Sequence, residues 1–282
     1  MNIVSDTPWE TYTANDTRIH VKREDLCCPY PGPSFSKIRG LFAYINTKLN
    51  SSLYPPDCIG VVDSIHSKAG WGTAYLCHDL NIPCMVFYPY TKAQGIDKIG
   101  YFQFRCLDLG ASIYPIPATK SAVLWYKARK IFKDGHPTGL LLPNGLKLQE
   151  TVNQTCEELV NDALAVHLAS NPESCWIISI SSGTIAAGVI KGLAKLLYKG
   201  TIILHMGYSR SRDGLRHYLS KMDCNYANVR IQIIDEGYGY SDLVQCKSPF
   251  PCNPYYDLKA WKWLQEHIDI LPKNIVFWNI GA

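Results

Sequence analysis

The sequence predicts an α/β protein of two domains, in which open, twisted and mostly parallel sheets carry helices on both faces. Short apolar runs of strand length alternate with longer segments of helical periodicity along nearly the whole chain. Such alternation is typical of parallel sheets that are covered on both sides. The length of 282 residues is enough for two ordinary domains with substantial cores.

The segment before residue 53 contains a turn at 7–10, a strand at 19–22, a loop rich in Pro and Gly, and a helix through Leu41, Ile45 and Leu49. The next segment is expected to form a smaller α/β domain, residues 53–145. Its strands are expected at 58–63, 83–88, 112–116 and 140–142, and its helices at 73–80, 96–109 and 121–133.

The same alternation resumes after residue 145. One long helix is expected at 148–168, followed by strands at 176–180, 201–206, 229–234 and 275–278 and helices at 185–197, 214–222 and 256–267. Residues 1–52 and 146–282 then form the larger domain. In such folds, ligands bind at the carboxyl ends of the strands.

Composition excludes several classes of protein. A hydrophobic content of 47% and a net charge of +4 fit a soluble globular chain, and the charge suits an anionic small ligand or weak contact with nucleic acid. The 11 cysteines show no CxxC spacing, and the 8 histidines show no metal-ligand spacing, so no metal site is expected. Lysines interrupt the apolar run 185–204, which excludes a membrane span. The N-terminus lacks signal-peptide features, so a cytoplasmic location is expected, with a homodimer as the default assembly.

A lysine lies where a helix is expected to begin, in Ser36-Lys37-Ile38-Arg39. Helix N-termini favour anions, so the field there favours the neutral, nucleophilic form of a nearby amine. Lysines that form Schiff bases need that form. A solvated lysine at a helix start is the alternative, so the functional interpretation of Lys37 requires a cofactor site elsewhere in the chain.

A loop of small residues provides a candidate for that site. Ser181-Ser182-Gly183-Thr184 lies between an apolar strand and a helix, where backbone N–H groups and hydroxyls can converge on one phosphate. The loop is neither a Walker loop nor a GxGxxG fingerprint. An ordinary turn capped by Ser or Thr has the same pattern, and this alternative stays open.

Two further stretches carry charge. Tyr208-Ser209-Arg210-Ser211-Arg212, with Arg216 and His217, is a solvated loop and helix start or an edge that recognises a phosphorylated substrate or nucleic-acid backbone. Asp235-Glu236 is a strand-end cap or turn, or a carboxylate pair.

Three stretches in order resemble the fold-type II pyridoxal-phosphate-dependent enzymes, the tryptophan synthase β-like superfamily. Within it they are most similar to the aminocyclopropane-carboxylate deaminase and D-cysteine desulfhydrase branch. The stretches are Val21-Lys22-Arg23-Glu24-Asp25-Leu26 with Ser36-Lys37-Ile38-Arg39; Ile65-His66-Ser67-Lys68-Ala69; and Ser181-Ser182-Gly183-Thr184 with Gly188 and Gly192. The resemblance covers most of the chain and implies pyridoxal 5′-phosphate (PLP) as the cofactor.

The resemblance also implies roles for single residues. Lys37 would hold PLP through a Schiff base and then act as general acid and base, while Ser181, Ser182, Gly183 and Thr184 would bind the cofactor phosphate. Ser67 would bind the substrate carboxylate or assist proton transfer, and Tyr255 would lie on the substrate side. Asn279 lies near the position of the family's partner for the pyridine nitrogen.

The sequence departs from the family pattern in several places. The phosphate loop has two serines where glycines are usual, the C-terminal stretch lacks the usual His-Thr-Gly-Gly, and the chain is shorter than typical members. Lys68 stands where the family has an asparagine beside the phenolic oxygen of the cofactor, with which a lysine can pair. Two amines can then face one aldehyde. We expect Lys37 to be the covalent partner, because its local motif matches the family and that of Lys68 does not.

Three functions fit these features. The first is a PLP-dependent lyase or deaminase that acts on a small amino acid. The second is a PLP-dependent decarboxylase or lyase that remodels an amino-acid adduct on modified thymidine in bacteriophage DNA, in the host cytoplasm. Compact relatives of this kind resemble the chain, and its basic edge suits a macromolecular substrate. The third is a non-catalytic binding protein that has kept the fold.

Overall fold

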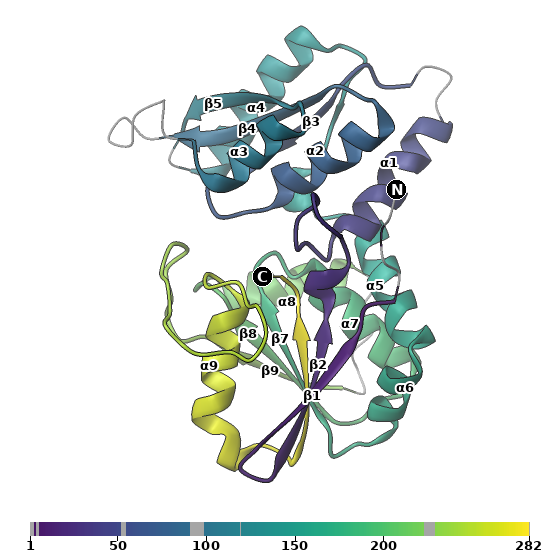
Figure 1. Ribbon diagram of the computed structural model, residues 1–282, viewed down its shortest axis with the longest axis vertical. Helices are drawn as coiled ribbons and strands as arrows, with labels where there is room; N and C mark the ends of the chain where they lie inside the picture. Colours follow the sequence, from purple (N-terminus) through teal and green to yellow (C-terminus); the bar gives the residue numbers. More distant parts are fainter. Residues whose placement is uncertain are drawn as a thin grey trace. The chain divides into compact units, whose positions relative to one another are not determined.

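The computed structural model describes residues 3, 6–51, 55–90, 99–118, 120–222 and 229–281. Contacts within the chain divide it into two compact units (Figure 1). The small unit comprises Met1–Asn2, Pro29–Pro33 and Leu41–Leu148, and the large unit comprises Ile3–Cys28, Ser34–Gly40 and Gln149–Ala282. The predicted domain limits at 53 and 145 stay a prediction.

The large unit is built on a six-stranded sheet with the strand order β1-β2-β10-β7-β8-β9. Its strands are β1 Trp9–Ala14, β2 Thr17–Arg23, β7 Cys175–Ile180, β8 Thr201–Met206, β9 Arg230–Ile234 and β10 Asn274–Asn279. β1 is antiparallel to β2, and all other neighbouring pairs are parallel. The carboxyl ends of five strands therefore share one edge of the sheet.

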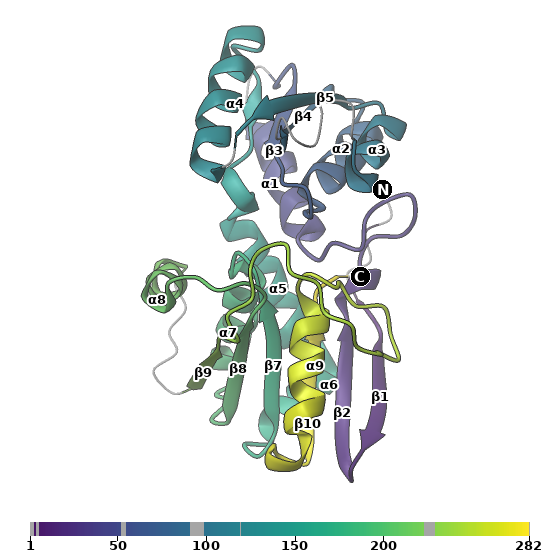
Figure 2. The same cartoon turned by 90° about the vertical axis from the view of Figure 1, so that its left-hand side faces the viewer.

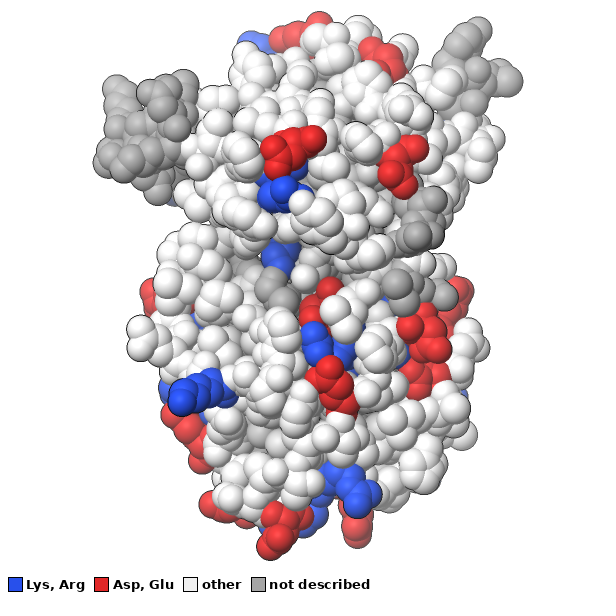
Figure 3. All heavy atoms as spheres, in the orientation of Figure 1, with Lys and Arg blue, Asp and Glu red and all other residues white. Residues whose placement is uncertain are grey.

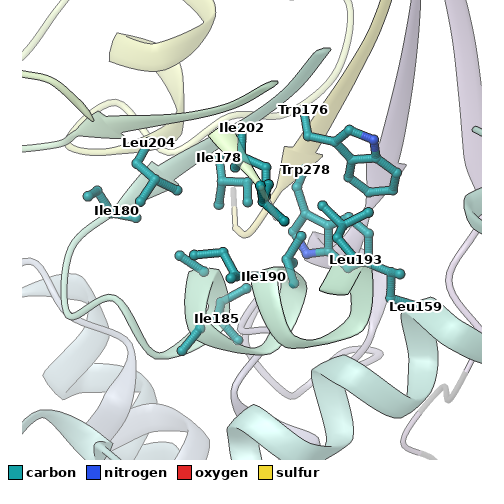
Figure 4. Packing of buried hydrophobic residues seen from close by; sticks show 14 of the residues in the cluster. Leu159, Trp176, Ile178, Ile180, Ile185, Ile190, Leu193, Ile202, Leu204 and Trp278 are labelled. Atoms are coloured by element: carbon teal, nitrogen blue, oxygen red, sulfur yellow. The ribbon is translucent and has the colours of Figure 1, made fainter. Parts of the chain in front are cut away.

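Helices cover both faces of this sheet, as the sequence predicts. They are α5 Gln149–Asn161, α6 Ala163–Ser170, α7 Thr184–Lys195, α8 Arg212–Lys221 and α9 Asp257–His267. Figure 2 shows α9 on one side of the sheet and α5 and α6 on the other. The core beneath α5 and α7 is closely packed around Trp176 and Trp278, whose rings stack with a centroid separation of 6.1 Å (Figure 4).

Glycines allow α5 to approach its neighbours closely. A Cβ at Gly188 of α7 would lie 2.5 Å from Thr155 Cβ, and one at Gly40 would lie 2.2 Å from Thr151 Cα. Any side chain at either position would force the helices apart, because real Cβ atoms do not approach other atoms so closely. The segment that carries Lys37 is thus held against α5.

Two sequence predictions are wrong in the large unit. The expected turn at 7–10 contributes to β1, because Asn15 and Asp16 both adopt left-handed backbone conformations and close a tight hairpin onto β2. The expected single helix at 148–168 is divided at Asp162, which caps α6 by accepting a hydrogen bond of 2.9 Å from the N–H of Ala165.

The small unit contains a four-stranded parallel sheet with the order β5-β4-β3-β6. Its elements are α1 Ile38–Ser51, which begins in the large unit, β3 Ile59–Val62, α2 Ala69–Leu80, β4 Cys84–Tyr90, α3 Tyr101–Asp108, β5 Ser112–Pro117, α4 Ser121–Gly135 and β6 Leu140–Leu141. Short 3₁₀ helices occur in the chain at Glu24–Leu26, Asn144–Leu146 and Ile268–Ile270. The first part of the predicted helix 96–109 falls on residues outside the described ranges.

The two faces of the small sheet pack against different helices. Val62 and Phe87 pack with Phe132 of α4, and Val86, which points the opposite way from Phe87, lies beside Gly70 of α2. Helices therefore cover both faces here as well, and the predicted fold class is confirmed. Of the helices that the structure describes, none combines the length and apolar content needed to cross a membrane.

Candidate functional site

Lys37 lies directly before α1 and close to the loop that follows β7. Its Nζ donates a hydrogen bond of 2.8 Å to Ser182 Oγ, although 145 positions separate the two residues in the sequence. Lys37 is half-buried, and the neighbouring Ser36 is buried. Two of the predicted site residues, from distant parts of the chain, are thus in direct contact.

The loop 181–184 continues this contact as a series of hydroxyl groups. Ser182 Oγ and Thr184 Oγ1 are 3.1 Å apart, and Thr184 Oγ1 shares a hydrogen bond of 2.8 Å with the hydroxyl of Tyr218 in α8. Ser181 is half-buried. The sequence analysis missed Tyr218, because a tyrosine beside the buried Leu215 and Leu219 of an amphipathic helix has the pattern of a core-edge residue.

A buried glycine lets the loop turn into the start of α7. Gly183 has a φ of 91°, a left-handed conformation that favours glycine, and a Cβ there would lie 3.2 Å from Leu215 Cδ1 and Tyr218 Cδ1. The first turn of α7 contains no acidic residue. In the described chain, the N–H groups of Ile185 and Ala186 have no acceptor, as expected for a helix N-terminus. This arrangement suits an anion.

Buried charges hold the backbone next to Lys37. Arg39 donates a hydrogen bond of 2.7 Å to Glu24 and further bonds to Glu158 of α5. Burial and the adjacent Glu24 raise the pKa of Glu158 to about 8. Burial alone would raise the pKa of Glu24 too, but the Arg39 guanidinium together with hydrogen bonds to Glu158 and Thr7 lowers that pKa. Loss of one partner from such a buried group costs about 3–5 kcal/mol, so Arg39 fixes the position of α1's first turn.

Asn279, at the end of β10, is fully buried and has several partners. Its Nδ2 donates hydrogen bonds of 2.9 Å to Asp25 Oδ1 and to the carbonyl of Pro251, and the Cys252 thiol lies 3.7 Å from its Oδ1. Both N–H donors of the amide are therefore occupied. Only its oxygen can serve a cofactor ring without breaking these bonds.

Tyr255 is half-buried, and its backbone N–H donates a hydrogen bond of 2.9 Å to Asn253 Oδ1. The adjacent Tyr256, which the sequence analysis did not select, packs against Gly207 at the end of β8 and shares a hydrogen bond of 3.1 Å with Tyr240. Asp235 and Glu236 do not act as a carboxylate pair. Asp235 accepts from Gly237 N and Ser209 Oγ, and Glu236 contacts His205 at 2.8 Å.

Ser67 and Lys68 belong to the loop between β3 and α2 in the small unit. Asp63 organises this loop, because its carboxylate accepts hydrogen bonds from Ser64 N at 2.8 Å and Gly70 N at 2.9 Å. Burial raises the pKa of Asp63 to about 7. Ser67 Oγ accepts from Ala69 N at 3.1 Å. Lys68 is buried, with Nζ 5.7 Å from the ring centroid of Phe102.

Comparisons with known proteins agree with this arrangement. No family model matches the chain. The glycyl-dTMP PLP-dependent decarboxylase of Pseudomonas phage M6 is 47% identical over 287 residues, which cover 99% of both chains. This chain belongs to the fold-type II PLP-dependent enzymes.

Solved structures show the same fold at low sequence identity. An ACC deaminase homologue matches with a TM-score of 0.75 and 18% identity, over 100% of this chain and 90% of the other. A threonine deaminase from T.th. matches with a TM-score of 0.65 and 16% identity, over 98% and 92% of the two chains. The cofactor of the chain described in this structure is therefore PLP.

The residues around Lys37 are suited to binding PLP. A primary amine lies beside a loop that combines two hydroxyls, a glycine in a left-handed conformation, and a helix N-terminus free of acids. These are the groups needed to bind an aldehyde and a phosphate of the same molecule. In the described part of the chain, no cluster of His, Cys, Asp and Glu is arranged to hold a metal ion.

Proposed function

We propose that this enzyme is a decarboxylase that removes CO₂ from an amino acid attached to a thymidine nucleotide. The observation that carries the proposal is full-length similarity, at 47% identity, to a phage decarboxylase whose name specifies glycyl-dTMP. The contact between Lys37 and Ser182 supports it, because it places the amine beside the proposed phosphate loop. The similarity favours the second of the three functions considered from the sequence, whereas the contact supports the PLP chemistry that the first two share.

In this reaction the bond between Cα and the carboxylate carbon breaks, CO₂ leaves, and Cα takes up a proton. PLP, when bound, supplies the electron sink for the pair left on Cα. Lys37 would hold the cofactor covalently and afterwards donate a proton to Cα, in the place of the carboxylate that has left. Ser182 would orient the amine of Lys37 through their hydrogen bond. Ser181, Ser182, Gly183 and Thr184 would bind the cofactor phosphate.

The other predicted residues keep their proposed roles. Ser67 would bind the substrate carboxylate or assist proton transfer, and Lys68 would pair with the phenolic oxygen of the cofactor. Tyr255 would contact the substrate. Asn279 would accept a hydrogen bond from the pyridine nitrogen through its oxygen, since its own N–H groups are occupied. We also propose a homodimer that works in the host cytoplasm, and light scattering of the purified protein measures the assembly.

The experiment compares a thymidine nucleotide that carries a glycyl adduct with a panel of free amino acids. We expect the nucleotide to lose one CO₂, seen by mass spectrometry, and no ammonia to be released from the amino acids. Lys37→Ala should lower the rate by about 10³-fold or more, because both the covalent link and the proton donor are lost. Borohydride reduction and peptide mapping should place the cofactor on Lys37 in the wild type.

The matched control is Lys48→Ala, which removes an exposed lysine from α1, the helix that follows Lys37, and should retain full activity. Ammonia release from a free amino acid without action on the nucleotide would favour the lyase or deaminase alternative. A cofactor that remains covalently trapped in Lys37→Ala would refute the role of Lys37 and turn attention to Lys68.

A further inference from the structure

Arg210 follows β8 and has an unusual environment. Its Nε and Nη2 atoms are both buried, and no hydrogen-bond partner for either lies among the described residues. These two nitrogens point to the same side of the guanidinium and form the edge that binds two oxygens of a phosphate or carboxylate. Buried donors without a partner are uncommon in proteins, because leaving them unpaired is unfavourable. Such an edge suits an anion supplied from outside the chain.

The segment that carries Arg210 leaves the sheet beside the proposed phosphate loop. Ile180 and Met206 are partners at the ends of the parallel strands β7 and β8, and Gly207 N donates a hydrogen bond of 3.0 Å to the carbonyl of Ile180. Ser211, next in the chain, caps α8, whose Tyr218 contacts Thr184. Residues 207–211 and 181–184 therefore occupy adjacent positions at the carboxyl edge of one sheet.

Tyrosines hold the guanidinium and extend the surface. The Cζ of Arg210 lies 5.8 Å from the ring centroid of Tyr208, within the range of a cation–π contact. The rings of Tyr208 and Tyr240 meet edge to face at 5.3 Å, and the hydroxyls of Tyr240 and Tyr256 are hydrogen-bonded. Aromatic faces beside an arginine are the groups with which proteins bind a base and its phosphate together.

The charges of the basic stretch 208–217 are not equally available to an anion. On α8, Arg216 contacts Asp213 at 3.4 Å, which partly neutralises it. Arg210 is half-buried, and its Nε and Nη2 are buried donors without a partner among the described residues. On the face drawn in Figure 3, basic and acidic side chains of the described residues occur in small, mixed groups, and most of that face is uncharged.

We propose that Arg210 binds a phosphate of the nucleotide substrate through its Nε and Nη2 edge, while Tyr208 holds the guanidinium in place. The inference rests on the proposed function, which requires a substrate with both an amino-acid end and a nucleotide end. The amino-acid end must reach Lys37, and the nucleotide phosphate is then the anion left for Arg210. The phosphate of the modified nucleotide itself and that of the next nucleotide in a DNA strand share this chemistry.

The test measures binding and catalysis separately, with the PLP-loaded enzyme. Calorimetric titration compares thymidine, thymidine 5′-monophosphate and a short thymidine oligonucleotide, for the wild type and for Arg210→Gln and Arg210→Lys. We expect Arg210→Gln to weaken phosphate-bearing ligands by about 10- to 100-fold and to leave thymidine unchanged, because one charge-assisted bidentate contact is lost. Arg210→Lys should fall between, since a lysine keeps the charge without the two-donor edge.

Catalysis of the glycyl-bearing nucleotide should follow the same pattern, with a raised KM and a kcat within about threefold of the wild type. If Arg210→Gln binds the mononucleotide more weakly, the bound group is the phosphate of the modified nucleotide itself. If only the affinity for the oligonucleotide falls, the bound group is a neighbouring phosphate. The control is Arg18→Gln, which removes an exposed arginine near the start of β2, at the opposite edge of the sheet, and should change neither binding nor KM.

Equal binding of all ligands by wild type and Arg210→Gln would overturn the proposal. So would a weaker affinity for PLP in the variant, measured by absorbance, because Arg210 would then serve the cofactor. If the wild type binds thymidine 5′-monophosphate through Arg210 but releases no CO₂ from the glycyl-bearing nucleotide, the phosphate site stands and the proposed reaction fails. The two failures are therefore distinguishable.

Discussion

The loop after β3 and the loop after β7 differ in how they satisfy the unpaired N–H groups at the start of the next helix. Each connects a buried parallel strand to the N-terminus of a helix, where N–H groups lack partners within the helix. In the small unit, Asp63 supplies a carboxylate of the chain itself, which accepts hydrogen bonds from Ser64 and Gly70. In the large unit, the first turn of α7 has no acid, and Gly183 before it adopts a left-handed conformation.

The difference bears on the proposed phosphate site, which uses the start of α7. At the start of α2 the carboxyl group of Asp63 already accepts hydrogen bonds from the backbone, whereas the field at the start of α7 is not compensated by an acid in its first turn. The hydroxyls of Ser182 and Thr184 add donors without adding negative charge. An anion site at a helix N-terminus thus depends as much on the acid that is missing as on the donors that are present.

The largest effect is expected when the loop after β7 is given an acid of its own. Ser182→Asp places a carboxylate at the start of α7 and beside Lys37, where it opposes the cofactor phosphate and holds the amine in its charged form. We expect the affinity for PLP to fall by about 100-fold or more, while stability of the cofactor-free protein stays equal or rises by about 0.5 kcal/mol. Absorbance titration with PLP and urea unfolding measure the two quantities.

The neutral variant Ser182→Asn separates charge from shape in this loop. It should lose much less affinity for PLP than Ser182→Asp. If the two variants lose affinity equally, the absence of an acid at α7 is not what makes the site.

A smaller effect is expected at the glycine of the same loop. Gly183→Ala places a side chain on a residue with a φ of 91° and against Leu215 and Tyr218. The backbone strain costs about 1–2 kcal/mol, and the loop must shift, so the affinity for PLP should fall by about tenfold. Gly110→Ala provides the control, because Gly110 has a similar φ of 78° with open space around it. Gly110→Ala should lose stability but keep its affinity for PLP. An equal fall in affinity for PLP in both variants would contradict the role of the loop.

The smallest effect is expected when the acid is removed from the loop after β3. Asp63→Asn should destabilise the protein by about 1 kcal/mol at pH 5, because a buried N–H loses its acceptor. Burial raises the pKa of Asp63 from 3.8 to about 7, so the folded state binds this proton more tightly than the unfolded chain. The stability that Asp63 contributes is therefore full below about pH 4 and is lost as the pH rises through 7.

Urea unfolding of Asp63→Asn and wild type at pH 5 and pH 8 tests this sign. The difference in the free energy of unfolding should be larger at pH 5 than at pH 8. Asp134→Asn, which changes an exposed acid of α4, should show no such dependence. A difference that grows with pH would contradict the proposed state of Asp63.

Local patterns in the sequence are enough to predict the fold class and to mark Lys37 and the loop 181–184 as candidates. Alternating strands and helices, a lysine before a helix and a run of small residues after a strand are all visible within short windows. The hairpin β1–β2 was missed because the signal lies in the two left-handed residues Asn15 and Asp16, whereas Thr7-Pro8 suggested a turn. The break between α5 and α6 depends on one capping residue, Asp162, inside an otherwise helical pattern.

Contacts between distant segments could not be predicted in the same way. The bond between Lys37 and Ser182 and the pairing of Arg39 with Glu158 depend on how β2, β7 and α5 are placed in the folded unit. The sequence shows Arg210 only as part of a basic stretch. That its Nε and Nη2 are buried without a partner can be seen only in the folded chain. Asn279 looked like a free ring partner, and only the structure shows that Asp25 and Pro251 occupy its amide.

The position of β10 has a consequence for biosynthesis. This strand is the last in chain order, yet it lies in the middle of the six-stranded sheet and joins β2 to β7. Without β10, the strand β2 that precedes Lys37 and the strand β7 that precedes the loop 181–184 have no common sheet. Domains generally fold as units, so we expect the large unit to complete its sheet, and the proposed cofactor site to form, only after β10 has been synthesised.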